Sequence, residues 1–327
     1  MKVTLDLDRL LADGSIDKTE YDKLLRLSSQ GTASLAFSII IGFGVVAVSL
    51  GLIALVPDAI TGLVLGVALL GGGLALQLGQ SGRWDVVAHI CVLVGALSLA
   101  GGIVVLAQAS IPAFLAIAAG FAIVGVLARS GLLVVLAVLA LSSSIGARTG
   151  YEHATYFLGI EEPTATVILF ALLALAALLA SLRLPADYSR LAILAARTSV
   201  FLVNFGFWIG SLWGDTVNPF GLLSSLPVAE GVEGEVAAGI DIDRQVFVIG
   251  WAVALVATGI WAAMANRRWV VTVVAVFAMI HLYTQWFEWL GPHPLSILLA
   301  GLVTLAVAIA LWNFNRGLWS WRGAAGA

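Results

Sequence analysis

A short run of polar side chains inside an apolar segment is the part of the sequence best suited to chemistry. Residues 270–290 are long enough to cross a bilayer, yet their second half carries His281, Thr284, Gln285 and Glu288. At about 100° per residue, these four side chains fall within roughly one third of a helix circumference. Polar groups at membrane depth are costly unless they face protein or water, so this stripe is a candidate ligand-binding site.

A second apolar segment, residues 195–213, carries a matching stripe of Asn204, Trp208 and Ser211. At about 1.5 Å per residue, Asn204 and His281 lie at similar depths, roughly 13 Å and 18 Å from the starts of their segments. If the two stripes face each other, they line a polar cleft with Asn204 and His281 at its floor. We expect this cleft to open toward the periplasm and to bind or transport a small polar molecule or a lipid.

An interpretation without any ligand is also open, and it is the simpler one. Asn204 and Gln285 are typical of hydrogen bonds between membrane helices. The aromatic residues near the segment ends are those of an interfacial belt: Trp208, Trp213, Tyr283, Trp286 and Trp289. Under this interpretation the polar stripes serve only helix packing and orientation in the bilayer.

Other chemistry finds little support in the sequence. No nucleophile-elbow motif marks a serine, and the four histidines are scattered, with no second histidine three or four residues away. Cys91 is the single cysteine and lies in an apolar run, so it predicts neither a disulfide nor a metal site. We expect no catalytic residue, no metal and no cofactor, and the sequence favours a protein that is not an enzyme. No basic patch predicts a nucleic-acid partner.

The composition indicates a membrane protein. Of the 327 residues, 61% are hydrophobic and only 11% are charged, whereas soluble domains usually carry about 25% charged residues; the mean hydropathy is +1.06. The fold class we predict is an all-α, polytopic membrane helix bundle occupying residues 34–313. The predicted spans are residues 34–56, 59–79, 86–108, 111–128, 131–147, 164–182, 195–213, 245–265, 269–290 and 294–313.

The basic residues are distributed unevenly between the loops. When the N-terminus is placed in the cytoplasm, all of the 16 basic residues except Arg148 and Arg244 fall on the inner side. This is the bias of the positive-inside rule, and one helix too many or too few would scramble it. We therefore predict ten spans with both termini in the cytoplasm, including a cytoplasmic tail at residues 314–327.

Polar segments flank and interrupt the predicted bundle. Residues 1–33 are charged, with an apolar stripe of leucines, a glycine stop at Gly14 and capping-box spacing from Asp17 to Glu20. They predict a short cytoplasmic amphipathic helical hairpin. Residues 214–244 are strongly acidic and predict a periplasmic loop.

The N-terminal sequence LDRLLADGSIDKTEYDKLL, followed by the glycine-patterned IIIGFGVVAVSLGLIALVP, is similar to the opening of a bacterial membrane protein family. It resembles the domain of unknown function twenty-one fifty-seven over roughly the first 110 residues. The resemblance implies a multi-pass protein of the bacterial inner membrane. It implies no activity and no functional residues.

Two classes of function follow from these features. The first is a binding or transport protein for a small polar molecule or a lipid, with candidate ligand-binding residues on the two stripes: Asn204, Trp208, Ser211, His281, Thr284, Gln285 and Glu288. The second is a non-catalytic accessory or scaffold subunit of a larger membrane complex, because glycine-rich faces such as Gly62 to Gly73 permit close helix packing. The expected partners are membrane lipids and either another membrane protein or further copies of the chain.

Overall fold

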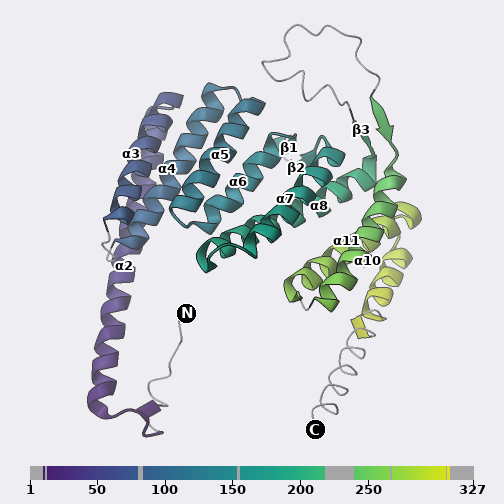
Figure 1. The fold of residues 1–327 in the computed structure, drawn as a ribbon. Coiled ribbons are helices and arrows are strands. Elements are labelled where there is room, and N and C mark those ends of the chain that lie inside the picture. The colour runs from purple at the N-terminus through teal and green to yellow at the C-terminus, as the bar shows by residue number, and fades with distance from the viewer. Residues whose placement is uncertain are drawn as a thin grey trace. The chain divides into compact units, whose positions relative to one another are not determined.

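The computed structural model describes residues 10–11, 13–79, 84–152, 155–217, 239–265, 267–306 and 308–309. Figure 1 shows that most of these residues are helical, which confirms the predicted all-α class. The labelled helices are α2 (Lys18–Leu55), α3 (Ala59–Leu78), α4 (Asp85–Leu106), α5 (Ile111–Leu127), α6 (Gly131–Ser143), α7 (Pro163–Ser181), α8 (Ala186–Trp213), α10 (Arg244–Met264) and α11 (Arg268–Leu290). A further helix covers Pro294–Ala306.

Six helices within the described residues are long and apolar enough to cross a membrane: α3, α4, α7, α8, α10 and α11. Many of their large apolar side chains face outward; Leu78 and Met264, for example, are 82% and 78% exposed. Such surfaces suit contact with lipid, because soluble proteins rarely expose large apolar patches. The apolar part of α2, Ile39–Leu55, and the helices α5, α6 and Pro294–Ala306 are shorter, so the count of ten spans stays a prediction.

Helix α2 begins at the predicted capping box. The backbone N–H of Glu20 donates to Asp17 at 2.7 Å, and the backbone N–H of Asp17 donates to Glu20 at 3.1 Å, which satisfies two otherwise free N-terminal donors. Gly14 has a positive φ of 68° at the preceding turn. The helix has no end at residue 33 and continues to Leu55. The predicted hairpin itself stays a prediction, because residues 1–9 and 12 lie outside the described residues.

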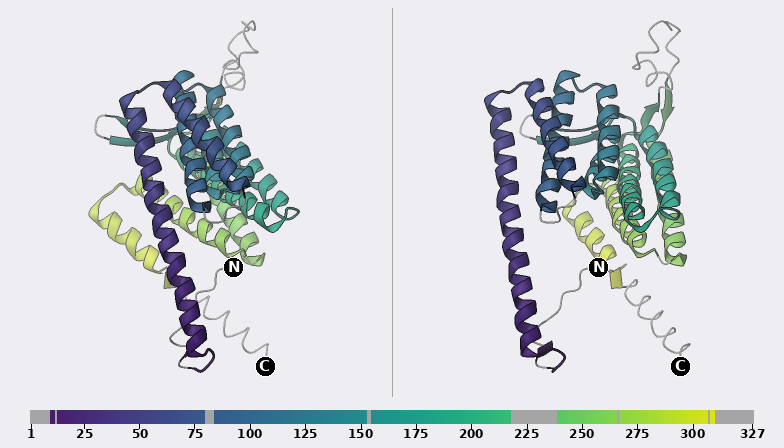
Figure 2. Two further views of the ribbon diagram at one scale, coloured as in Figure 1. Left: turned by 90° about the vertical axis from the view of Figure 1, so that its left-hand side faces the viewer. Right: turned by 60° about the vertical axis from the view of Figure 1, so that its left-hand side comes forward.

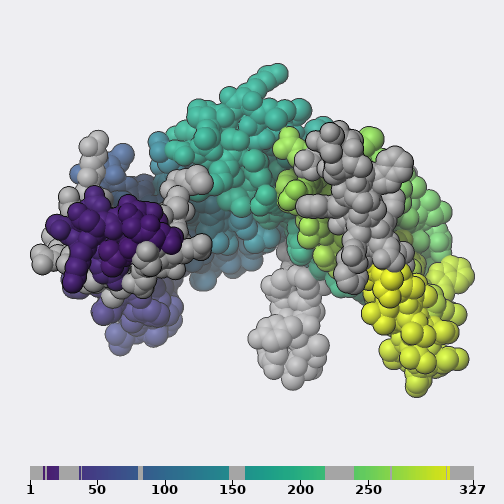
Figure 3. Space-filling model, turned by 90° about the horizontal axis from the view of Figure 1, so that it is seen from below, coloured from purple at the N-terminus to yellow at the C-terminus, as the bar shows by residue number. Residues whose placement is uncertain are grey.

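The chain forms two compact units, of which the first comprises residues 1–147, 173–199 and 225–230. Within it, α2 runs beside α3 and α4 and projects beyond their ends (Figures 1 and 2); Figure 3 shows the projecting end of α2 in purple. Helices α3 and α4 cross closely because small residues meet there. A Cβ added to Gly66 would lie 2.6 Å from the backbone nitrogen of Leu99, so only glycine fits at this contact.

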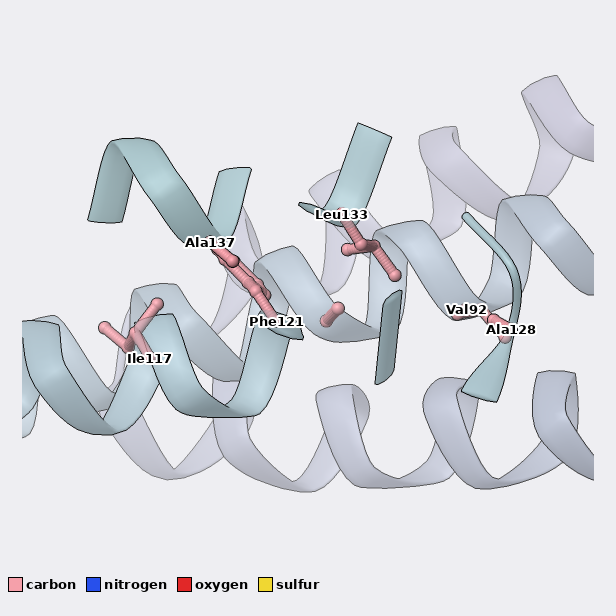
Figure 4. Packing of buried hydrophobic residues seen from close by; sticks show 7 residues of the cluster. Val92, Ile117, Phe121, Ala128, Leu133 and Ala137 are labelled. Carbon is pink, nitrogen blue, oxygen red and sulfur yellow. The ribbon is translucent and has the colours of Figure 1, made fainter. Parts of the chain in front are cut away.

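The buried core of this unit lies among α4, α5 and α6. In Figure 4, Phe121 lies beside Ala137, and Val92 lies beside Ala128. All members of the cluster are apolar: Val92, Ala96, Ile117, Phe121, Ala128, Leu133 and Ala137. Leu133 is fully buried. The ion pair between Arg129 and Asp187, at 2.9 Å, connects the α5–α6 turn with the start of α8.

The second unit comprises residues 148–172, 200–224 and 231–327. It contains β2 (Thr155–Ile160), a short antiparallel pair of β3 (Asp215–Val217) with β4 (Ile240–Ile242), and helices α10 and α11. The strand β1 (Ala147–Glu152) pairs with β2. These small sheets were not predicted. The pair β3–β4 forms the base of the predicted acidic loop, whose residues 218–238 lie outside the described residues, as does the predicted tail at 314–327.

Candidate functional site

The two predicted polar stripes lie in the second unit, on α8 and α11, and α10 contacts both. An apolar cluster of Trp251, Leu255 and Phe277 holds these helices together. The ring of Phe277 stands edge-on to that of Phe201 on α8, with 5.6 Å between centroids, and lies 6.5 Å from that of Trp251 on α10. Aromatic pairs at such distances add to the stability that burial alone provides.

Asn204 is buried and makes hydrogen bonds with both ends of its amide. Its Oδ1 accepts from Nε1 of Trp251 at 3.0 Å, and its Nδ2 donates to the carbonyl of Val200 at 2.8 Å. Trp251 is fully buried, so Asn204 provides the acceptor that its indole N–H needs in an apolar environment. Asn204 therefore bonds the neighbouring helix α10, in the manner of the interpretation without a ligand.

The outer parts of the two stripes also meet. Nε1 of Trp208 donates to Oγ1 of Thr284 at 3.0 Å, which connects α8 directly to α11. Oγ of Ser211, which is buried, donates to the carbonyl of Trp208 at 2.7 Å. The structure thus brings the predicted faces together, and four of the predicted residues make hydrogen bonds within the protein: Asn204, Trp208, Ser211 and Thr284.

His281 and Gln285 differ from their neighbours on the stripe. The Nδ1 atom of His281 and the Nε2 atom of Gln285 are buried, and neither has a hydrogen-bond partner among the described residues. Four residues separate them, so they lie one helical turn apart on the same face of α11. The ring of His281 stands edge-on to that of Trp251 with 4.8 Å between centroids. Two adjacent buried polar atoms therefore still need hydrogen-bond partners.

Glu288 completes the stripe at the end of α11. Its carboxylate lies 3.7 Å from the guanidinium of Arg244, the first residue of α10, and both side chains are about half exposed. Surface ion pairs of this kind contribute little to stability. Arg244 nevertheless offsets the charge of Glu288 at this end of the stripe.

The structure corrects one part of the predicted cleft, and it divides the aromatic belt of the interpretation without a ligand. Asn204 and His281 do not form an open floor together, because Trp251 lies against both of them. The predicted aromatic belt divides into two groups. Trp213 and Trp289 are 74% and 75% exposed, as belt residues would be. The other members bond neighbouring helices: Trp208 to Thr284, Tyr283 to Thr304, and Trp286 to Ser296.

Trp251 is the residue of this site that sequence analysis missed. One signal could have identified it: it lies seven residues inside α10, about 10 Å from the helix start. A tryptophan in an interfacial belt lies at a segment end, whereas a tryptophan this deep needs a buried acceptor for its N–H. Asn204, at a comparable depth in another span, is such an acceptor.

A separate acidic group lies at the start of α7. A carboxylate oxygen of Asp215 on β3 accepts from the backbone N–H of Thr164 at 2.7 Å and so caps the helix from a distant part of the chain. Burial, reinforced by the negative charges of Asp215 and Glu161, raises the pKa of Glu162 above its ordinary value. Within the described residues, no group of histidine, cysteine and acidic side chains could hold a metal ion.

Comparison with known proteins gives no relative: no protein-family model, no curated protein and no solved structure matches the chain. The chemistry of the site therefore carries the functional argument.

Proposed function

We propose that the protein binds a small, neutral polar molecule, for storage, sensing or transport across the membrane, at the polar face of α11 that packs against α8 and α10. The observation that carries the proposal is the pair of buried atoms Nδ1 of His281 and Nε2 of Gln285, which have no hydrogen-bond partner among the residues that the structure describes. A buried polar group without a partner costs roughly 1–3 kcal/mol. A bound molecule that forms a hydrogen bond with each atom would remove this unfavourable free energy at both positions.

The chemistry of the two atoms defines the molecule. Nε2 of Gln285 is a donor, so the ligand needs an acceptor such as a carbonyl or hydroxyl oxygen. Nδ1 of His281 donates or accepts according to its tautomer, so it suits a hydroxyl or amide group. Trp251 lies against the ring of His281 and closes one side of this position, and the pair Arg244–Glu288 lies at the outer end of the stripe. Entry from the outer side agrees with the outward-facing cleft that we predict from the sequence.

Mass spectrometry of small molecules retained by the purified protein tests the proposal. We expect a stoichiometric polar compound in the wild-type protein, and its loss in His281→Ala and in Gln285→Ala. Thr272→Ala is the matched control on the same helix, because the Thr272 hydroxyl is bonded to its own backbone at Arg268. Equal retention by all four proteins, or no compound in any of them, contradicts the proposal.

A scaffold or accessory subunit is the second candidate function. Gly44 and Gly51 lie seven residues apart on α2, and a Cβ added to either would meet nothing within 4 Å. Glycines spaced by two turns that face open space could receive another membrane helix, as small residues do at helix–helix contacts. Mild cross-linking in the native membrane distinguishes the two candidates. A second chain recovered in stoichiometric amount, and lost on Gly44→Leu, favours the scaffold.

We further propose the location that the loop charges predict: the bacterial inner membrane, with both termini in the cytoplasm. The resemblance of the N-terminal sequence to the domain of unknown function twenty-one fifty-seven supports this location and stays a prediction.

A further inference from the structure

The first unit contains an apolar pocket among α2, α3 and α4 that the proposed function does not use. Its volume is about 640 Å³, within the range of roughly 300–1,000 Å³ that ligand pockets occupy. Along α4 its wall runs from Leu93 to Val105, about 18 Å at the rise of an α-helix. The pocket is therefore an elongated groove, shaped for a chain rather than for a compact molecule.

Glycines form part of the groove wall. Gly101 lines the groove, and a Cβ added there would meet nothing within 4 Å. Gly62 also lines it, where α3 comes close to the carbonyl of Ser98. The hydroxyl of Ser49, another wall residue, is bonded to the carbonyl of Val45 at 2.6 Å, so it offers little to a polar ligand. These walls match a hydrocarbon chain, and each buried methylene contributes about 0.8 kcal/mol.

Among the described residues that line the groove, one is charged: Asp58, at the end where α2 leads into α3. Asp58 is the N-cap residue of α3, yet its side chain makes no capping hydrogen bond, although an aspartate in this position ordinarily accepts one. It is exposed and has no ion-pair partner among the described residues. The groove therefore combines an apolar body with one free carboxylate at its end.

We propose that this groove is a specific lipid site, which holds one acyl chain of an aminophospholipid while Asp58 pairs with the ammonium of the headgroup. The charge selects the lipid class. An ammonium headgroup such as that of phosphatidylethanolamine complements the carboxylate, whereas the net negative headgroup of phosphatidylglycerol is repelled by it. The site lies wholly within the first unit and is independent of the ligand proposed near His281.

Native mass spectrometry of the full chain, titrated with phosphatidylethanolamine or phosphatidylglycerol of identical chains, tests the site. We expect the wild-type protein to retain phosphatidylethanolamine about fivefold better than phosphatidylglycerol, because an exposed ion pair changes affinity by about this factor. Asp58→Asn should abolish this preference. Gly101→Leu would fill the groove and reduce retention of both lipids to background. Gly71→Leu is the matched control, because a Cβ at Gly71 also meets nothing within 4 Å and Gly71 does not line the groove.

A second measurement uses the unaltered protein and so does not depend on whether the variants fold. Phosphatidylethanolamine with a photoreactive group on its acyl chain should cross-link to residues 46–62 and 93–105, and excess phosphatidylethanolamine should compete better than phosphatidylglycerol. Cross-links spread evenly over all apolar helices would overturn the proposal. So would retention of lipid by Gly101→Leu at the wild-type level, or a wild-type protein that does not distinguish the two lipids.

Discussion

At the scale of single residues, the hydrogen bond between Trp251 and Asn204 explains why two polar groups can lie deep among apolar helices. Each satisfies the other, and the second half of the Asn204 amide is satisfied by its own helix at Val200. Membrane helices lack water to bond such groups, so an unpaired indole N–H or amide would be costly. The pair therefore holds α8 against α10 at a defined register.

A double-mutant cycle of Asn204→Ala and Trp251→Phe measures this pair. We expect an interaction free energy of about 0.6–1.7 kcal/mol, the range found for hydrogen bonds between membrane helices. The measurement is the free energy of unfolding in detergent. A control cycle combines Trp251→Phe with Thr272→Ala, which lies on α11 and bonds its own backbone, and should show no interaction. A value near zero in the first cycle would refute the role of the bond.

Glu162 makes stability depend on pH. Burial first, then the charges of Asp215 and Glu161, raise its pKa in the folded protein above 4.5. A raised carboxyl pKa means that the folded state holds the proton more tightly, so stability falls as the pH rises from 4.5 through the folded-state pKa. We expect Glu162→Gln to be slightly more stable than wild type at neutral pH, with the difference vanishing below pH 4.5. Thermal unfolding across this range measures it, and a variant less stable than wild type at neutral pH would contradict it.

At the scale of elements, glycine position decides how closely α3 and α4 approach. Gly66 and Gly71 occur in the same helix, but only Gly66 faces α4. A Cβ at Gly66 would lie 2.6 Å from the nitrogen of Leu99 and 2.9 Å from the oxygen of Gly95, both backbone atoms that cannot rotate away. A Cβ at Gly71 meets nothing within 4 Å.

The two glycines therefore predict opposite effects of the same substitution. Gly66→Ala should destabilise the protein by roughly 1–3 kcal/mol, because α4 must move away from α3. Gly71→Ala should stabilise it by roughly 0.5–1 kcal/mol, because alanine is the better helix former. Unfolding in detergent compares both with wild type. Equal effects of the two substitutions would show that the close crossing is not the controlling contact.

At the scale of the whole molecule, three contacts join residues that the loop charges assign to the same side of the membrane. Arg129 pairs with Asp187, and both are predicted to be inside. The backbone of Thr164 bonds Asp215, and Arg244 pairs with Glu288; all four are predicted to lie at the outside. A topology with one helix more or fewer between the members of a pair would put them on opposite sides.

Cysteine accessibility tests the predicted ten spans. Cys91→Ser removes the only cysteine, so single cysteines can then be placed at Asp187 and Asp241. In intact cells a membrane-impermeant maleimide should label position 241, on the outer side, and should not label position 187 until the membrane is opened. Labelling of position 187 in intact cells would refute the predicted topology. Labelling of both positions in opened membranes is the control for reactivity.

The sequence alone determined the properties that depend on local composition and period. Apolar length indicates the helices and the membrane class, loop charge predicts the orientation, and the Asp17–Glu20 spacing predicted the start of α2. The shared faces of Asn204, Trp208 and Ser211, and of His281 to Glu288, also follow from helical period alone. Each of these features is encoded within a few turns of one segment.

Only the tertiary structure decided which polar groups are satisfied. Trp251, on a third helix, donates a hydrogen bond to Asn204, and Trp208 donates one to Thr284. In the part of the chain that the structure describes, the buried Nδ1 of His281 and Nε2 of Gln285 have no hydrogen-bond partner. Sequence analysis also did not predict that α2 continues past residue 33 or that β3 pairs with β4. Hydrogen-bond partners far apart in the chain are chosen by packing, and a period along one helix carries no information about what packs against it.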